Sequence, residues 1–134
     1  MEEFRSITIV RIRRPKGKDI NNDLQWFSKS LGLFKSRDKE KSCFRVFMEL
    51  LKEKSGLTSD EIALGSNLTR GTVVHHLHSL TESGLIIKRK NKYYLITDNL
   101  EELIKELERD VEITLDSLKE TAKFIDKQLN LNKD

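Results

Sequence analysis

Three histidines within four positions, His75, His76 and His78, are the residues of this sequence whose spacing first suggests chemistry. His75 and His78 stand three residues apart and share one face of a helix, as a pair of zinc ligands can. Two ligands are too few for a metal site, and the single cysteine, Cys43, cannot form a cysteine zinc cluster. We therefore expect no metal and no bound cofactor.

Basic residues form a second group with a recognisable chemistry. Arg70 precedes the histidines, and four cations follow within five positions: Lys88, Arg89, Lys90 and Lys92. Arginine and lysine bind phosphate oxygens, and arginine also pairs with O6 and N7 of guanine. The net charge of +3 hides an uneven distribution, because residues 1–97 hold 19 basic and 11 acidic residues whereas residues 98–134 hold 6 and 11. Residues 1–97 therefore carry the excess positive charge, and this part of the chain would attract a polyanion.

Other classes of protein find little support in the sequence. It contains no glycine-rich phosphate loop, no metal-binding helix motif and no nucleophile elbow. Cys43 stands among apolar residues, so we expect it to be buried rather than reactive. No apolar run approaches the ~20 residues that span a bilayer, and the N-terminus lacks the apolar stretch of a signal peptide. We expect a cytoplasmic protein that is not an enzyme and has no membrane partner.

The elements that must position the histidines and cations are two short helices and a hairpin. Thr58 and Glu61 fit a capping box before a helix that Gly65 stops, and Thr69 can cap a second helix over residues 69–83, ended by Gly84. Two helices joined by so short a connection form a helix-turn-helix. Two strand-like runs then flank Asn91-Lys92, which predicts a basic hairpin, or wing, over residues 86–96.

The segments before this motif are less specific. Residues 7–13 are rich in β-branched side chains, and apolar and polar residues roughly alternate, which predicts a short strand. The basic run that follows contains Pro15 and Gly17, which break any regular element. This arm is either solvated or in contact with a phosphate backbone or minor groove. Helices are expected from Asp19 or Asn21 to about residue 33 and over residues 38–54. Their aromatic residues are better explained as a core than as a small-molecule pocket.

The last segment, from Asp98 as a candidate N-cap to about Leu131, predicts one long helix without glycine or proline. Its apolar positions follow coiled-coil spacing and then a stutter: Leu100, Ile104, Leu107, Val111, Thr114, Leu118, Ala122, Ile125 and Leu129. Such a helix is too long to be covered by the preceding domain, so we expect it to form a homodimer. Folding back onto its own domain is the alternative.

Residues 69–86, TRGTVVHHLHSLTESGLI, resemble the recognition-helix signature of the ArsR-like winged-helix transcriptional regulators, particularly those of archaeal type. The resemblance covers roughly residues 43–97, and the last helix suits the dimerisation helix of that group. It implies a DNA-binding regulator and specifies no effector ligand. Metal sensors of that family use paired cysteines near the helix-turn-helix or Asp, His and Glu on the last helix; this chain has no cysteine after Cys43 and no histidine after His78.

The spacing within residues 69–83 separates two faces of the helix. Val73, Leu77 and Leu80 should pack on Ile62, Ala63 and Leu68. The opposite face would offer five residues to a major groove: Arg70, Gly71, Val74, His75 and His78. Thr69 and Thr72 suit phosphates at the helix N-terminus, and the four hairpin cations would add affinity without sequence preference.

These observations lead to one main expectation and one alternative. The fold is expected to be mainly α with a small β-hairpin wing, in which an arm (residues 1–18) and a winged helix-turn-helix (19–97) precede a coiled-coil helix (98–134). The expected function is sequence-specific binding of double-stranded DNA by a homodimeric regulator, acting as a repressor by occlusion. The alternative is a module that binds another protein.

Overall fold

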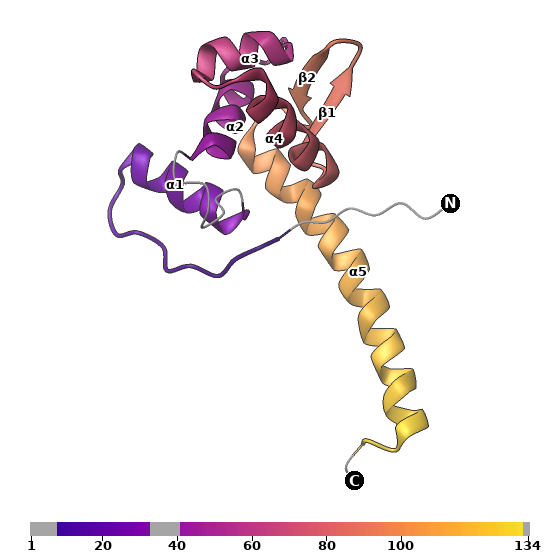
Figure 1. Ribbon diagram of the computed structural model, residues 1–134. Helices are drawn as coiled ribbons and strands as arrows, with labels where there is room; N and C mark the ends of the chain where they lie inside the picture. Colours follow the sequence, from indigo (N-terminus) through magenta and orange to yellow (C-terminus); the bar gives the residue numbers. More distant parts are fainter. Residues whose placement is uncertain (1–7, 33–40, 133–134) are drawn as a thin grey trace. The chain divides into compact units, whose positions relative to one another are not determined.

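The structure, a computed structural model, describes residues 8–32 and 41–132. The chain divides into two compact units, Met1–Ile96 and Thr97–Asp134. The described part is mainly helical, with five helices and one antiparallel hairpin (Figure 1). In chain order the elements are α1 (Ile20–Ser30), α2 (Ser42–Lys52), α3 (Ser59–Ser66), α4 (Arg70–Glu82), β1 (Ile86–Arg89), β2 (Lys92–Leu95) and α5 (Leu100–Leu129).

The N-terminal segment departs from the sequence prediction. Residues 8–13 form no strand, and Ile7 lies outside the described residues. Among the described residues, no strand pairs with this backbone; Val10 instead donates its N–H to the carbonyl of Ser30, 2.8 Å away. Asp19 caps α1 by accepting the N–H of Asn21, and the helix ends at Ser30, before the predicted residue 33. The predicted start of the second helix at residue 38 also lies outside the described residues.

Helices α2, α3 and α4 contact one another and enclose the core of the first unit (Figure 1). Strand β1 contacts α4, and β2 contacts α2. In these elements and at the residue before β1, the following large apolar side chains are buried: Val46, Phe47, Leu50, Ile62, Val73, Leu77, Leu80, Leu85 and Ile86. Cys43 is also buried, as predicted. Each of these helices is short, so burial of one face by its neighbours supplies most of the stability that holds it in place.

Helix α3 begins with the predicted capping box. The Thr58 hydroxyl accepts the N–H of Glu61 at 3.1 Å, and the Glu61 carboxylate accepts the N–H of Thr58 at 2.9 Å. The Thr58 backbone N–H, and then its hydroxyl, lower the pKa of Glu61 from its ordinary value of 4.5. The ionised carboxylate therefore stabilises the fold above that ordinary value, and this contribution is lost as pH falls through the lowered pKa.

We expect Thr58→Ala to lower the free energy of unfolding by about 1 kcal/mol, because the N–H of Glu61 loses its acceptor. Urea denaturation at neutral pH measures this change. Thr58→Ser is the matched control, since it keeps the hydroxyl and should retain most of the stability. Equal losses in the two variants would show that the methyl group, and not the cap, matters at this position.

The end of α3 differs from the prediction at Gly65. The helix continues through Ser66 and ends where Asn67 adopts a left-handed conformation with φ +55°. Arg45 of α2 donates to the carbonyl oxygens of both Ser66 and Asn67. An arginine from a neighbouring helix thus satisfies the last carbonyl groups of α3. This contact could not be read from the local sequence.

The hairpin turn is displaced by one residue from its predicted position. Arg89 pairs with Lys92, so the two-residue turn is Lys90-Asn91, and Lys92 belongs to β2. Lys90 takes the positive φ, +56°, that such a turn requires. Leu57, just before α3, adds an isolated bridge to Tyr93 through two backbone hydrogen bonds of 2.8 and 3.1 Å. Strand β2 of the hairpin is therefore hydrogen-bonded directly to the residue that precedes the helix pair α3 and α4.

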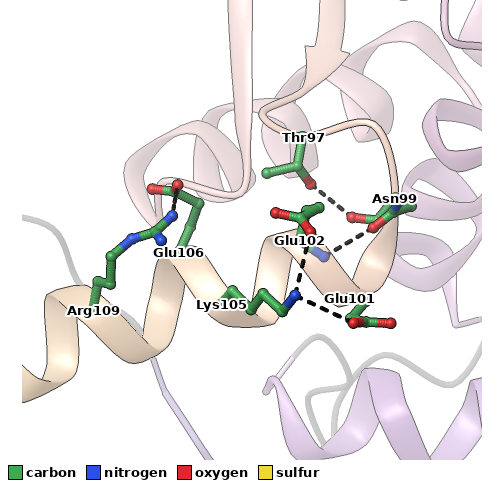
Figure 2. A network of polar contacts seen from close by, with 7 residues as sticks. All are labelled: Thr97, Asn99, Glu101, Glu102, Lys105, Glu106 and Arg109. Carbon is green, nitrogen blue, oxygen red and sulfur yellow. Dashed lines mark hydrogen bonds and ion pairs between the residues drawn. The ribbon is translucent and has the colours of Figure 1, made fainter.

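The second unit consists mainly of α5, whose N-cap is Asn99 rather than the predicted Asp98. The Asn99 side chain accepts the N–H of Glu102 at 2.8 Å, and the Thr97 hydroxyl donates to the Asn99 carbonyl (Figure 2). The next turns carry charged pairs: Lys105 with Glu101 and Glu102, and Arg109 with Glu106 (Figure 2). Hydrogen bonding to Glu101 and the charge of Glu102 raise the pKa of Lys105.

Helix α5 ends at Leu129, where Asn130 adopts a left-handed conformation, slightly before the predicted Leu131. Its 30 residues correspond to a length of about 45 Å. Across residues 8–32 and 41–132, no helix combines the length and apolar character needed to cross a membrane.

Candidate nucleic-acid interface

Helix α4 separates its two faces as the sequence predicts. Val73, Leu77 and Leu80 are buried, and α4 contacts α3, where Ile62 is buried too. Ala63 and Leu68, the other predicted packing partners, are half-buried. The opposite face is exposed at all five predicted positions: Arg70, Gly71, Val74, His75 and His78. The core thus holds α4 firmly while this face remains open to a partner.

Arg70 stands at the first turn of α4 and forms an ion pair that the sequence did not reveal. Its Nε lies 3.4 Å from Oδ1 of Asp60 on α3, and both side chains are largely exposed. An exposed pair of this kind contributes at most about 1 kcal/mol. Arg70 is therefore held near the start of α4 by a contact weak enough to be exchanged for a stronger acceptor.

The three histidines have different surroundings. His78 Nε2 lies 3.0 Å from the Glu82 carboxylate, one turn further along α4. His76 instead forms a 2.6 Å hydrogen bond with the Ser42 hydroxyl of α2 and so joins two helices. Among the described residues, no three of His, Cys, Asp and Glu gather as metal ligands would. His75 and His78 therefore remain on the exposed face as polar side chains.

The N-terminus of α4 is capped by Thr69. The Thr69 hydroxyl accepts the N–H of Thr72 at 3.2 Å and donates to the Thr72 hydroxyl at 2.9 Å. Gly71 lies between them in open space, since a Cβ at this position would meet nothing within 4 Å. A partner can therefore approach the backbone of this turn closely, and the helix dipole favours an anion there.

The four hairpin cations gather at and near the turn. Arg89 lies directly opposite Lys92 in the antiparallel register, and Lys90 occupies the turn between them. The ammonium group of Lys88 lies 5.5 Å from the ring centroid of Tyr93. In the described part of the chain, none of the four forms an ion pair with a carboxylate. Like charges opposite each other destabilise a hairpin, and an external anion would relieve that repulsion.

Two acidic residues beside the exposed face were missed by the sequence analysis. Glu82 lies four residues after His78, a spacing that the sequence alone could have revealed. Asp60 lies ten residues before Arg70, and only the packing of α3 against α4 brings the two together. Both carboxylates reduce the positive charge that the α4 face offers.

The predicted apolar stripe of α5 is exposed only in part. Leu107 is buried, and Leu100 and Val111 are half-buried. Leu103, which the sequence analysis did not place on the stripe, is fully buried. The remaining positions of the stripe are exposed: Ile104, Thr114, Leu118, Ala122, Ile125 and Leu129. From Ile113 onward, large apolar side chains on α5 face solvent.

Comparisons of this chain with protein-family models, with curated proteins and with solved structures found no match.

Proposed function

We propose that this chain is a sequence-specific regulator that binds double-stranded DNA, with α3 and α4 as the helix-turn-helix and β1 and β2 as the wing of a winged helix. It acts as a homodimer and represses transcription by occluding a promoter. The observation that supports this most is that one compact unit combines an exposed polar helix face with a hairpin whose four cations form no ion pair with a carboxylate of the described residues.

The hairpin would supply affinity through phosphates. Arg89 and Lys92 repel each other across the two strands, so a phosphate placed between them gains from both charges. If all four cations contact phosphates, affinity should fall about a hundredfold between 50 and 200 mM salt. This contribution is independent of the DNA sequence.

The α4 face would supply sequence preference in a major groove. Arg70 can pair with guanine O6 and N7 once it leaves Asp60, and the exposed side chain of Val74 can contact a thymine methyl group. His75 and His78 can hydrogen-bond to bases or phosphates. The second copy would place another α4 about one helical turn of DNA away.

A second copy is also the partner that best suits the exposed stripe of α5. Residues 100–116 hold seven acidic and two basic residues, whereas residues 117–129 hold two acidic and three basic ones. An antiparallel copy would set the acidic half of each helix against the more basic half of the other. Charge complementarity thus adds to the coiled-coil spacing of the apolar residues.

Selection of bound duplexes from a random DNA pool tests this function, followed by titration of variants on the enriched sequence. We expect Arg70→Ala to weaken binding about 5- to 150-fold and to relax the preference at one base pair. Lys90→Glu should weaken binding to every sequence and reduce the salt dependence. Asp60→Asn should tighten binding, because it removes a negative charge and releases Arg70.

Arg109→Ala is the matched control, since this arginine is also exposed and paired with a carboxylate but lies on α5. It should bind DNA like the wild type. A pool without an enriched sequence, or full binding by both Arg70→Ala and Lys90→Glu, would overturn the proposal and favour a module that binds protein.

A further inference from the structure

The segment before α1 is a second strongly basic feature of the first unit, separate from the hairpin. Residues 8–18 hold five cations and no acidic residue: Arg11, Arg13, Arg14, Lys16 and Lys18. All five are exposed, and within the described ranges none is paired with a carboxylate. So many unneutralised like charges in one short stretch repel one another and favour contact with a polyanion.

This segment is fastened to α1 rather than free. Val10 donates its N–H to the Ser30 carbonyl at 2.8 Å, and the indole N–H of Trp26 donates to the Ile12 carbonyl at 3.0 Å. The guanidinium group of Arg14 lies 5.9 Å from the Trp26 ring centroid, within the range of a cation–π contact. Three contacts with α1 therefore position this basic segment.

Such attachment matters for binding. A polybasic tail without contacts loses much conformational entropy when it is ordered on a partner, whereas a segment already held loses less. Ser30 and Trp26 form hydrogen bonds with the backbone on either side of Arg11. The guanidinium group of Arg11 is therefore carried by a backbone segment that is already held in place. Arginine also binds phosphate through two parallel hydrogen bonds, which a lysine cannot do.

We propose that residues 9–18 bind the DNA phosphate backbone as a contact additional to α4 and the hairpin, with Trp26 as the residue that positions them. This inference rests on the proposed function. It assigns a role to the arm that the sequence analysis left open between a solvated segment and a phosphate contact. Because the contact is to phosphates, it strengthens binding to any duplex and does not alter sequence preference.

The test removes three arm cations from the full-length protein, in the variant Arg11→Gln, Arg13→Gln, Lys16→Gln. Fluorescence anisotropy is measured on two duplexes, one enriched from the random pool and one of unrelated sequence, between 50 and 300 mM salt. We expect at least tenfold weaker binding to both duplexes at the lowest salt. The slope of log K against log salt should become shallower by about 2 to 3.

The matched control removes the same charge from exposed positions outside the arm, α4, the hairpin and α5, in the variant Lys29→Gln, Lys52→Gln, Lys54→Gln. It should leave the affinity and the slope within experimental error of the wild type. Trp26→Phe keeps every cation but removes the indole N–H that binds the Ile12 carbonyl. We expect it to weaken DNA binding severalfold while the far-UV circular dichroism spectrum stays unchanged. If Trp26 only stabilised the helical fold, weaker binding would be accompanied by a loss of helical signal.

The outcomes separate this inference from the proposed function. If the arm variant binds DNA with the affinity and slope of the wild type while Arg70→Ala and Lys90→Glu weaken binding, the arm proposal alone is wrong. If the arm variant weakens binding while those two variants bind fully, the arm contact stands and the proposed function fails. If the arm variant binds phosphatidylserine vesicles more weakly than the wild type but binds DNA equally well, the arm proposal is overturned in favour of a membrane contact.

Discussion

Replacing Leu118 and Ile125 by glutamine should convert a dimer of this protein into a monomer and weaken its binding to a two-half-site operator about 10²- to 10⁴-fold. Both side chains lie on the apolar stripe of α5, and they are 59 % and 44 % exposed. Glutamine keeps the helix propensity high and adds no charge, so the variant removes apolar contact area and little else. The loss follows because one binding event no longer raises the effective concentration of the second.

Light scattering at micromolar concentration measures the oligomeric state, and anisotropy with one or two half-sites measures binding. The control variant Lys119→Gln, Glu120→Gln introduces the same residue at two neighbouring positions off the stripe and leaves the net charge unchanged. It should remain dimeric. Affinity for a single half-site should be equal in all three proteins. A monomeric wild type would refute the role assigned to α5.

The second large effect is expected in the core that positions α4. Leu77→Ala should lower the free energy of unfolding by about 2 to 5 kcal/mol, because the truncation removes buried apolar contacts and leaves a cavity. Leu77 is 1 % exposed and lies between Val73 and Leu80 on the buried face. Small domains are stable by only about 5 to 15 kcal/mol, so this loss is a large fraction of the total.

Val74→Ala on the same helix is the matched control for this prediction. Val74 is 45 % exposed, and its truncation should change the free energy of unfolding by no more than about 0.5 kcal/mol. Urea denaturation followed by circular dichroism compares the two variants. Similar losses at the two positions would mean that the assignment of buried and exposed faces on α4 is wrong.

The sequence was most informative where local rules decide the structure. The Thr58 and Thr69 caps, the left-handed Gly84 after α4 and the buried triad of α4 were all predicted correctly. Each depends on residues within one or two helical turns, so spacing and side-chain chemistry are sufficient. The exposed face of α4, and with it much of the candidate interface, followed from the same periodicity.

Predictions that depended on distant partners were less accurate. The strand expected at residues 7–13 is not formed by the described residues 8–13, because Val10 bonds to Ser30 of α1 and no strand in the described part of the chain pairs with this segment. The end of α3 moved past Gly65 because Asn67 could take the left-handed conformation and Arg45 bonds the last carbonyl oxygens. The hairpin turn moved by one residue because Arg89 pairs with Lys92.

By itself the sequence determined the approximate helical segments, the caps of α3 and α4, the apolar periodicities and the separation of basic from acidic residues along the chain. Only the tertiary structure brought Asp60 to Arg70, joined His76 to Ser42 and attached the basic arm to Trp26. These pairs are separated by 10 to 34 residues in the chain, so no local pattern encodes them. They form because burial of the apolar faces of the helices brings remote polar groups within hydrogen-bonding distance.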